Sequence, residues 1–509
     1  MKQKLLYTLL LAAGTISGAF AQNGSDAQML ARIREEGMSH SKVMQTAFNL
    51  TDVSGPRLAN SPGLKRAQDW AVNALKTWGI VNTKREPWGK FGKGWEVQKN
   101  YAAITAPYYH AVIAIPKAWT PGTNGPISAD VVVIKADSVV DLARYKGKLK
   151  GKIVMLDTKP LEERSFKADA SRYTDAELTE LAAAAPSAGG RPRTAGNLLS
   201  FRTALNKFYT EEGVGLVLSQ SRGTDGTVFT SGGTAYADTA KTPAPELETS
   251  SEDFQRILRL VNAGVPVKME ADVKTQFFSN DLQGYNVVGE LEGSDRKNEL
   301  VIIGGHLDSW HAATGATDNA AGSAVMLEAM RILKRVGFKP RRTIRVVLWS
   351  SEEQGLHGSR NYVLNHFGDP KTMVLKPEQA KVSAYYNLDN GAGKIRGIYT
   401  QGNDAIGPIF KSWLEPFKDL GAATVTVRNT GGTDHLAFDA IGIPGFQFIQ
   451  DGLDYGSRTH HSNQDTYDRL NEDDLKQAAT VVAAFVYYTS QRDEMMPRKE
   501  LPKPAAVKN

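Results

Sequence analysis

The sequence predicts an α/β fold in which a mixed, mostly parallel sheet is flanked by helices and interrupted by a β-rich inserted domain. Two short apolar runs, Leu300–Gly305 and Thr343–Trp349, have the texture of strands that are buried on both faces. A helical pattern over Ala320–Arg335 separates them, so the three elements form a βαβ unit. Between residues 116 and 275 this pattern stops, and short strands alternate with turns that contain Pro and Gly.

The other elements follow from periodicity and turn residues. Helices are expected over residues 25–50, 64–79 and 472–490. Strands of the α/β domain are expected at residues 285–291, 382–388, 424–427 and 445–449, and strands of the insert at residues 130–134, 151–156 and 213–218. Residues 182–196, rich in Ala, Pro, Gly and Arg, are expected to form a surface loop or hairpin.

The N-terminus has the pattern of a targeting segment. Lys2 and Lys4 precede an apolar stretch, Leu5–Ile16, and the small-x-small triplet Ala19–Ala21 predicts cleavage before Gln22. We therefore expect a periplasmic or secreted protein without a membrane anchor in its mature form. The predicted divisions are residues 1–21 for the signal peptide, 22–115 and 276–492 for the α/β domain, 116–275 for the insert and 493–509 for a polar tail, which is expected to be disordered from Met495.

Composition excludes several classes of protein. Of the 509 residues, 41% are hydrophobic and 23% are charged, as in ordinary globular domains. The net charge of +6 is small and the Lys and Arg residues are scattered, so we expect no nucleic-acid partner. The chain has no cysteine, which excludes disulfides, thiol catalysis and cysteine-bound zinc.

Several side chains of metal-binding type follow predicted strands or turns. They are His306, Asp318, the pair Glu352-Glu353, Asp389 and the pair His460-His461. Imidazole and carboxylate ligands suit Zn²⁺, with cobalt or manganese as substitutes. Taken singly, each residue is more often a helix cap, a solvated group or a hydrogen-bonding group of the core. Because strand ends meet at one edge of an open α/β sheet, their combination favours a metal site.

Local context suggests a role for each residue. The carboxylate of Asp308 can accept the second ring N–H of His306 and fix its tautomer. Asp318 either caps the following helix or bridges two cations. Adjacent residues of an extended chain point to opposite sides, so one of Glu352 and Glu353 can bind metal while the other reaches the metal's water.

The combined motifs resemble the two-zinc exopeptidase family of bacterial leucyl-type aminopeptidases, glutamate carboxypeptidase and carboxypeptidase Q. The segments that carry the resemblance are Gly305–Asp308, Thr317–Gly322, Ser351–Ser359, Asn387–Asp389 and His461–Thr466. The resemblance covers roughly residues 54–113 and 284–490, and it implies a zinc exopeptidase-type sheet with a protease-associated-like insert. Carboxypeptidase Q is the most similar member at Gly55–Leu58, Asp69-Trp70 and Gly305–Trp310.

The resemblance implies two Zn²⁺ ions per chain and a role for each segment. The implied ligands are His306 and Asp389 for one zinc, Glu353 and His461 for the other, and Asp318 for both. Glu352 matches the general base, and Asp465 resembles a supporting residue. His460 stands where some members place a tyrosine that stabilises the oxyanion, so His460 and Tyr455 are candidates for that role. Residues 432–438 resemble a segment near the substrate pocket.

The expected reaction is hydrolysis of a peptide bond by a water shared between two cations, with Glu352 taking its proton. We expect a peptide substrate whose N-terminal residue is released, as by an aminopeptidase or a dipeptidase. A carboxypeptidase of the same family, a mono-zinc glutaminyl cyclase and a binding protein that kept the fold are the alternatives. A homodimer is left open.

Overall fold

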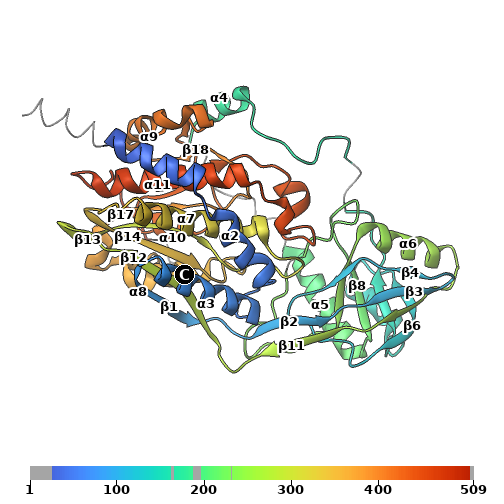
Figure 1. The fold of residues 1–509 in the computed structure, drawn as a ribbon. Helices are drawn as coiled ribbons and strands as arrows, with labels where there is room; N and C mark the ends of the chain where they lie inside the picture. Colours follow the sequence, from blue (N-terminus) through green and yellow to red (C-terminus); the bar gives the residue numbers. More distant parts are fainter. Residues whose placement is uncertain (1–25, 162–164, 187–195, 231, 505–509) are drawn as a thin grey trace, which may run out of the picture.

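The larger domain is built on an eight-stranded mixed sheet, which confirms the predicted α/β fold (Figure 1). The structure is a computed structural model that describes residues 26–161, 165–186, 196–230 and 232–504. The strands lie in the order β1 (Val81–Lys90), β12 (Gln283–Leu291), β14 (Arg342–Trp349), β13 (Arg296–His306), β17 (Val382–Asn387), β20 (Gly445–Gln450), β18 (Ile395–Tyr399) and β19 (Thr424–Thr426).

The centre of this sheet is parallel. β13 pairs in parallel with β14 on one side and β17 on the other, and β17 pairs in parallel with β20. The antiparallel pairs, β1 with β12, β12 with β14 and β18 with β20, lie toward the two edges. The carboxyl ends of four neighbouring strands therefore open onto one edge of the sheet.

Helices cover both faces of the sheet. One face is buried by α3 (Pro62–Thr77), α7 (Ala321–Arg335), α9 (Gly407–Leu414) and α11 (Glu472–Gln491), and the other by α8 (His357–His366) and α10 (His435–Asp439). Along β13, Val301 and Ile303 belong to the first core, whereas Ile302 belongs to the second. Because all three side chains are fully buried, the strand is continuously hydrophobic rather than alternating.

The N-terminal helix expected over residues 25–50 is broken. A helix over residues 26–39 is followed by α2 (Val43–Phe48) and a π-helical turn over Asn49–Val53. At the break, a carboxylate oxygen of Glu328 accepts the hydroxyl of Ser41 at 2.9 Å and the N–H of Lys42 at 2.8 Å. This tertiary contact with α7 stabilises a turn that local periodicity does not reveal.

The insert is built on a second eight-stranded sheet (Figure 1). Its order is β4 (His110–Ala111), β3 (Ala102–Ala106), β10 (Lys268–Ala271), β6 (Ile127–Ile134), β7 (Ile153–Leu156), β8 (Leu216–Gln220), β9 (Glu246–Thr249) and β5 (Ala114–Pro116). The sheet begins at Ala102, before residue 116 where the insert is predicted to begin. The insert helices are α5 (Gly196–Glu212) and α6 (Ser251–Asn262), and a ribbon of β2 (Gly94–Lys99) and β11 (Lys274–Phe278) joins the two sheets.

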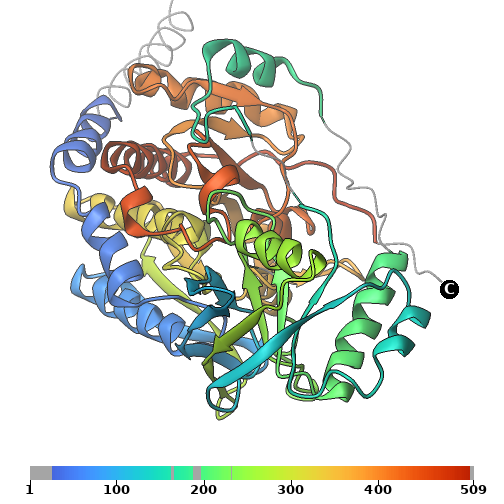
Figure 2. The ribbon, with the colours of Figure 1, turned by 90° about the vertical axis from the view of Figure 1, so that its right-hand side faces the viewer.

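One part of the insert returns to the α/β domain. Helix α4 (Asp175–Ala183) lies against β19, far from α5 and α6, as the two views show (Figures 1 and 2). Just before it, Ser171 pairs with Leu453, and Arg172 forms ion pairs with Asp451 and Asp474. The polypeptide between β7 and α5 therefore ties the insert to the α/β domain at a second place.

The C-terminal segment is more ordered than expected. Met496 is only 2% exposed, and Arg498 donates to the backbone carbonyls of Val382 at 2.7 Å and Gly442 at 3.0 Å. The prediction of disorder from Met495 is therefore wrong for this stretch, because one apolar and one cationic side chain anchor it. The predicted signal peptide lies outside the described residues. Within those residues, no helix is both long and apolar enough to span a bilayer.

Candidate metal centre

The side chains predicted to bind metal meet at the carboxyl edge of the sheet. They are His306 at the end of β13, Glu352 and Glu353 after β14, Asp389 after β17, Asp318 before α7, and His460 and His461 after β20. Each of these side chains is buried or half-buried in the structure. Parallel strands bring residues that are far apart in the sequence to this common edge, where α/β proteins place their sites.

Asp318 lies between two pairs that each consist of a histidine and a carboxylate. Its Oδ1 is 3.1 Å from Nε2 of His306, which is 3.2 Å from Oδ1 of Asp389. Its Oδ2 is 3.1 Å from Nε2 of His461, which is 2.8 Å from Oε2 of Glu353. One carboxylate thus contacts both histidines, an arrangement that suits a pair of neighbouring cations.

The charges of this cluster suit cations. Burial raises the pKa of Glu352 well above its usual range and, with the charge of Asp318, raises the pKa of Glu353 to about 7. Although burial lowers the pKa of both histidines, nearby carboxylates raise the pKa of His306 well above its ordinary value and that of His461 to about 10. Oε1 of Glu353 is buried and has no hydrogen-bond partner among the described residues. Buried carboxylates of this kind are stabilised by a metal, and imidazole with carboxylate is a donor set for zinc.

The backbone around Asp318 is fixed from two sides. The carboxylate of Asp465 accepts the N–H of Thr317 at 2.6 Å and that of Asp318 at 3.1 Å. Asn319, joined to Asp318 by a cis peptide bond, donates its side-chain amide to the carbonyl of Leu388 at 2.9 Å. Asp318 makes no side-chain cap to α7, so its carboxylate is available to the cluster.

Asp308 has a different role from the one predicted. Nδ1 of His306 donates to the backbone carbonyl of Asp308 at 3.0 Å, whereas the nearest carboxylate oxygen is 3.7 Å away. The carboxylate instead accepts the N–H of Glu352 at 3.2 Å and that of Glu353 at 3.4 Å. The backbone of Asp308 therefore fixes the histidine tautomer, and its side chain orients the turn after β14.

Arg57 is a part of the site that sequence reasoning missed. Its guanidinium is fully buried and donates to the carbonyls of Leu307 at 2.6 Å, Leu50 at 2.8 Å and Gly315 at 2.8 Å. Burial lowers its pKa to about 10. Leu307 directly follows His306, and Gly315 lies three residues before Asp318. Arg57 therefore stabilises the backbone next to both side chains. The sequence signal is a cation within a Gly-Pro turn, but its partners are defined only by the fold.

His460 lies at the edge of the cluster. Its Nε2 is 3.8 Å from Oδ2 of Asp318, its ring packs against Tyr455 at 4.8 Å, and its side chain is 37% exposed. Burial and the charge of His461 lower its pKa to about 4, so the imidazole is neutral at pH 7. In the predicted pocket segment, burial raises the pKa of Asp434 to about 7.

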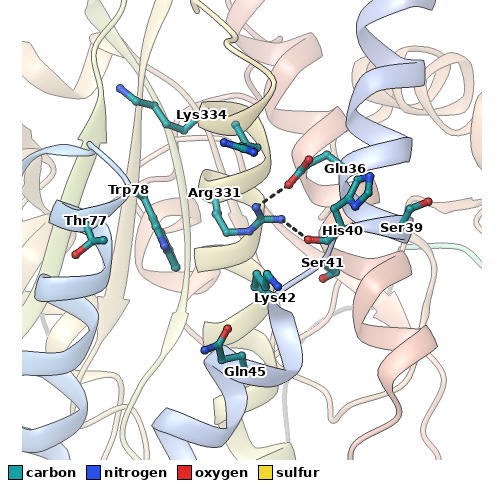
Figure 3. A pocket seen from close by; sticks show the side chains of 11 residues that line it. Glu36, Ser39, His40, Ser41, Lys42, Gln45, Thr77, Trp78, Arg331 and Lys334 are labelled. Atoms are coloured by element: carbon teal, nitrogen blue, oxygen red, sulfur yellow. Dashed lines mark hydrogen bonds and ion pairs between the residues drawn. The ribbon is translucent and has the colours of Figure 1, made fainter.

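Cavity size does not mark this centre. The cavity beside the cluster, lined in part by Trp310, Asp318 and Glu353, is about 10 Å³, room for roughly one water. A far larger cavity of about 990 Å³ lies elsewhere, where Arg331 contacts Glu36 (Figure 3). Two of its cations, Lys334 and Arg335, lie in the last turn of α7, where they offset the helix dipole, and the cavity contains none of the predicted metal ligands.

Known proteins share this sequence pattern and this fold. Residues 286–486 match peptidase family M28. Carboxypeptidase Q from Mus musculus is 26% identical over 522 residues, which cover 96% of this chain and 97% of that protein. The structure of a peptidase M28 precursor from Shewanella amazonensis SB2B is similar, with a TM-score of 0.68 at 27% identity, over 94% of this chain and 99% of that one. A zinc aminopeptidase from Bacillus subtilis has the same fold, with a TM-score of 0.54 at 19% identity, over 89% and 95% of the two chains.

The matched segment contains all of the predicted metal ligands and the proposed base. The similarities to the mouse protein and to the Shewanella structure also extend through the insert, because they cover nearly the whole length of each pair of chains. The chain thus contains a segment, residues 286–486, that matches peptidase family M28, and it is similar over nearly its whole length to a peptidase M28 precursor.

Proposed function

We propose that the chain is an exported two-zinc exopeptidase that releases N-terminal residues from peptides or dipeptides. The proposed ligands are His306 and Asp389 for one zinc, Glu353 and His461 for the other, and Asp318 for both. The observation that carries the proposal is the position of Asp318, whose two oxygens each lie 3.1 Å from a histidine that also contacts another carboxylate. Export is supported by the signal-type pattern of residues 1–21.

Glu352 is the proposed general base. When bound, the two zinc ions supply Lewis acidity toward a water molecule and toward the scissile carbonyl. Glu352 is 9% exposed, and burial raises its pKa well above the usual range, which suits a group that takes a proton and returns it to the leaving amine. Neutral His460 can donate a hydrogen bond to the oxygen on which negative charge develops.

The charges around the centre favour a cationic end of the substrate. The cluster is rich in carboxylates, and two nearby arginines are already engaged. Arg57 donates to backbone carbonyls, and Arg458 forms ion pairs with Asp169 and Asp225. A free α-amine, which is cationic at neutral pH, matches this field better than an α-carboxylate does.

A carboxypeptidase is the second candidate, and one residue of the insert favours it. Arg222 is exposed, and its guanidinium lies 4.0 Å over the ring of Phe229. The pKa of His460 is lowered mainly by burial and by the charge of His461, and the charge of Arg222 lowers it further. An arginine near the centre offers a bidentate partner for a free α-carboxylate. The mouse relative is named carboxypeptidase Q, and this name also favours a carboxypeptidase.

The two candidates are separated by a substrate panel. We would measure kcat/KM for free dipeptides, N-acetylated dipeptides, C-terminally amidated dipeptides and longer peptides, with and without a chelator. The proposal predicts chelator-sensitive cleavage that requires a free α-amine. Cleavage of N-acetylated but not C-amidated substrates would overturn it in favour of the carboxypeptidase. A Glu352→Gln preparation, purified in the same way, controls for contaminating peptidases.

A further inference from the structure

His461 has a backbone conformation that regular secondary structure does not impose. Its φ of 64° lies in the left-handed region, which is disfavoured for residues with a Cβ. The residue follows the π-helical turn Tyr455–Thr459 and belongs to no regular helix or strand. Its Nε2 nevertheless contacts both Asp318 and Glu353. A strained backbone persists at a functional side chain only where its surroundings hold it in place.

The surroundings that hold this loop belong to the insert. The contacts are Thr230 N–H to the His461 carbonyl oxygen at 2.7 Å, Val228 N–H to Asn463 Oδ1 at 2.8 Å, Asn463 N–H to the Val228 carbonyl oxygen at 3.1 Å, and an antiparallel bridge between Phe229 and Ser462. The insert residues in these contacts are buried. The peptide chain at His461 and directly after it is therefore hydrogen-bonded across the domain boundary.

Arg458 joins the same two segments from the other side. It donates to the Thr224 carbonyl at 2.8 Å and the Thr227 hydroxyl at 2.9 Å, and it forms ion pairs with Asp225 at 2.8 Å and Asp169 at 2.9 Å. The side chain of Arg458 is only 12% exposed and Thr227 is buried, whereas the side chains of Asp169 and Asp225 are 48% and 64% exposed. Because Arg458 lies three residues before His461, it connects the insert directly to the loop that carries the histidine.

We propose that Arg458 and the insert segment Thr224–Thr230 position His461 for metal binding, so that the insert is a structural part of the second metal site. The inference rests on the proposed function, since it requires His461 to be a metal ligand. Arg458 acts through the loop, as a positioning residue, and does not itself bind zinc. Loosening this contact is therefore expected to weaken the zinc held by Glu353 and His461 more than the zinc held by His306 and Asp389.

The test is a measurement of zinc affinity that does not depend on turnover. The two zinc affinities of the full chain and of Arg458→Ala would be measured by competition with chelators of graded strength. We expect one zinc to bind about 10- to 100-fold more weakly in the variant, with the other unchanged. Thr227→Val removes the hydroxyl that accepts from Arg458 and from Gln464 while it keeps the side-chain shape, and a smaller loss at the same zinc is expected.

Arg172→Ala is the matched control. Arg172 also joins the insert to the α/β domain, through Asp451 and Asp474, and in the described part of the chain its side chain forms no hydrogen bond or ion pair with Arg458 or His461. Wild-type zinc affinities are expected for it. Two wild-type affinities in Arg458→Ala, or an equal loss in Arg172→Ala, would overturn the inference. Circular dichroism and thermal unfolding show whether each variant is folded. If Arg458→Ala does not fold, the zinc affinities of Thr227→Val test the inference instead. A wild-type chain that binds no zinc would instead contradict the proposed function.

Discussion

The carboxylate of Asp308 accepts the backbone N–H of Glu352 at 3.2 Å and thereby joins the ends of two neighbouring strands. Asp308 follows β13, and Glu352 follows β14. The same carboxylate accepts the N–H of Glu353 at 3.4 Å. The proposed base and one proposed ligand therefore depend on a single anchor that binds no metal itself.

Replacement of that anchor should impair the reaction more than the fold. In Asp308→Asn the amide nitrogen cannot accept, so one N–H of the turn after β14 loses its partner. We expect kcat to fall about 10- to 100-fold, as for other residues that orient metal ligands. Steady-state kinetics and circular dichroism measure the two effects. Asp439→Asn, which removes an ion pair with Lys499, is the control, and an unchanged kcat in Asp308→Asn would refute the role.

Glu352 and Glu353 are adjacent and should respond differently to the same isosteric change. Glu352→Gln removes the base but no ligand, so we expect two zinc ions per chain and a kcat lower by about 10²- to 10⁴-fold. Glu353→Gln removes a ligand, so we expect loss of zinc. Metal analysis of both purified variants together with kcat measures this. Zinc loss in Glu352→Gln with retention in Glu353→Gln would reverse the assignment.

The buried His311 should make stability depend on pH. Burial lowers its pKa to about 4, its Nε2 donates to the Pro116 carbonyl at 2.6 Å, and its Nδ1 has no hydrogen-bond partner among the described residues. Because the unfolded imidazole titrates near 6.5, the unfolded chain binds the proton more readily. The neutral imidazole of His311 therefore makes its full contribution to the free energy of unfolding above about pH 6.5. This contribution falls by about 3 kcal/mol as the pH drops toward 4.

His311→Gln should flatten this part of the stability curve. The free energy of unfolding would be measured by denaturant titration between about pH 4.5 and 7.5 for both proteins. The difference between them should shrink as the pH falls, because the wild type alone loses the contribution of a neutral buried imidazole. A difference that stays constant with pH would contradict the assigned neutral state.

Gly322 allows helix α7 to approach the end of β17. A Cβ on Gly322 would lie 2.2 Å from the carbonyl oxygen of Leu388, the residue before Asp389. Gly322→Ala should therefore cost about 1–3 kcal/mol of stability and weaken zinc binding, since Asp318 and Asp389 would move apart. Thermal unfolding and zinc titration measure both effects. Gly407→Ala, where nothing lies within 4 Å of the added methyl, should leave both near wild type.

The predictable part of the fold is the part whose sequence pattern follows from burial. The continuous apolar run of β13 and the helical period of α7 reflect elements that are buried, and they predict the βαβ unit. β1 escaped prediction because it lies at the edge of the sheet and nearly all of its residues are exposed or half-buried, so its sequence is polar and contains Pro87.

The site was predictable where a side chain follows a strand and unpredictable where it depends on tertiary partners. His306 and Asp389 follow strands, so their convergence can be expected from parallel pairing alone. Arg57 makes its contacts with carbonyls about 250 residues away, which no local pattern encodes. The contact of Thr230 with His461 likewise requires the docked insert.

Zinc stoichiometry of the wild type and of Asp318→Asn tests the central claim most directly. Each protein would be purified, loaded with zinc, freed of excess metal and analysed for zinc per chain. The account predicts two zinc ions in the wild type and weakened binding of both in Asp318→Asn, because Asp318 contacts both histidines. One tightly held zinc in the wild type would contradict the account and favour the cyclase. Two zinc ions bound with wild-type affinity in Asp318→Asn would contradict the bridge.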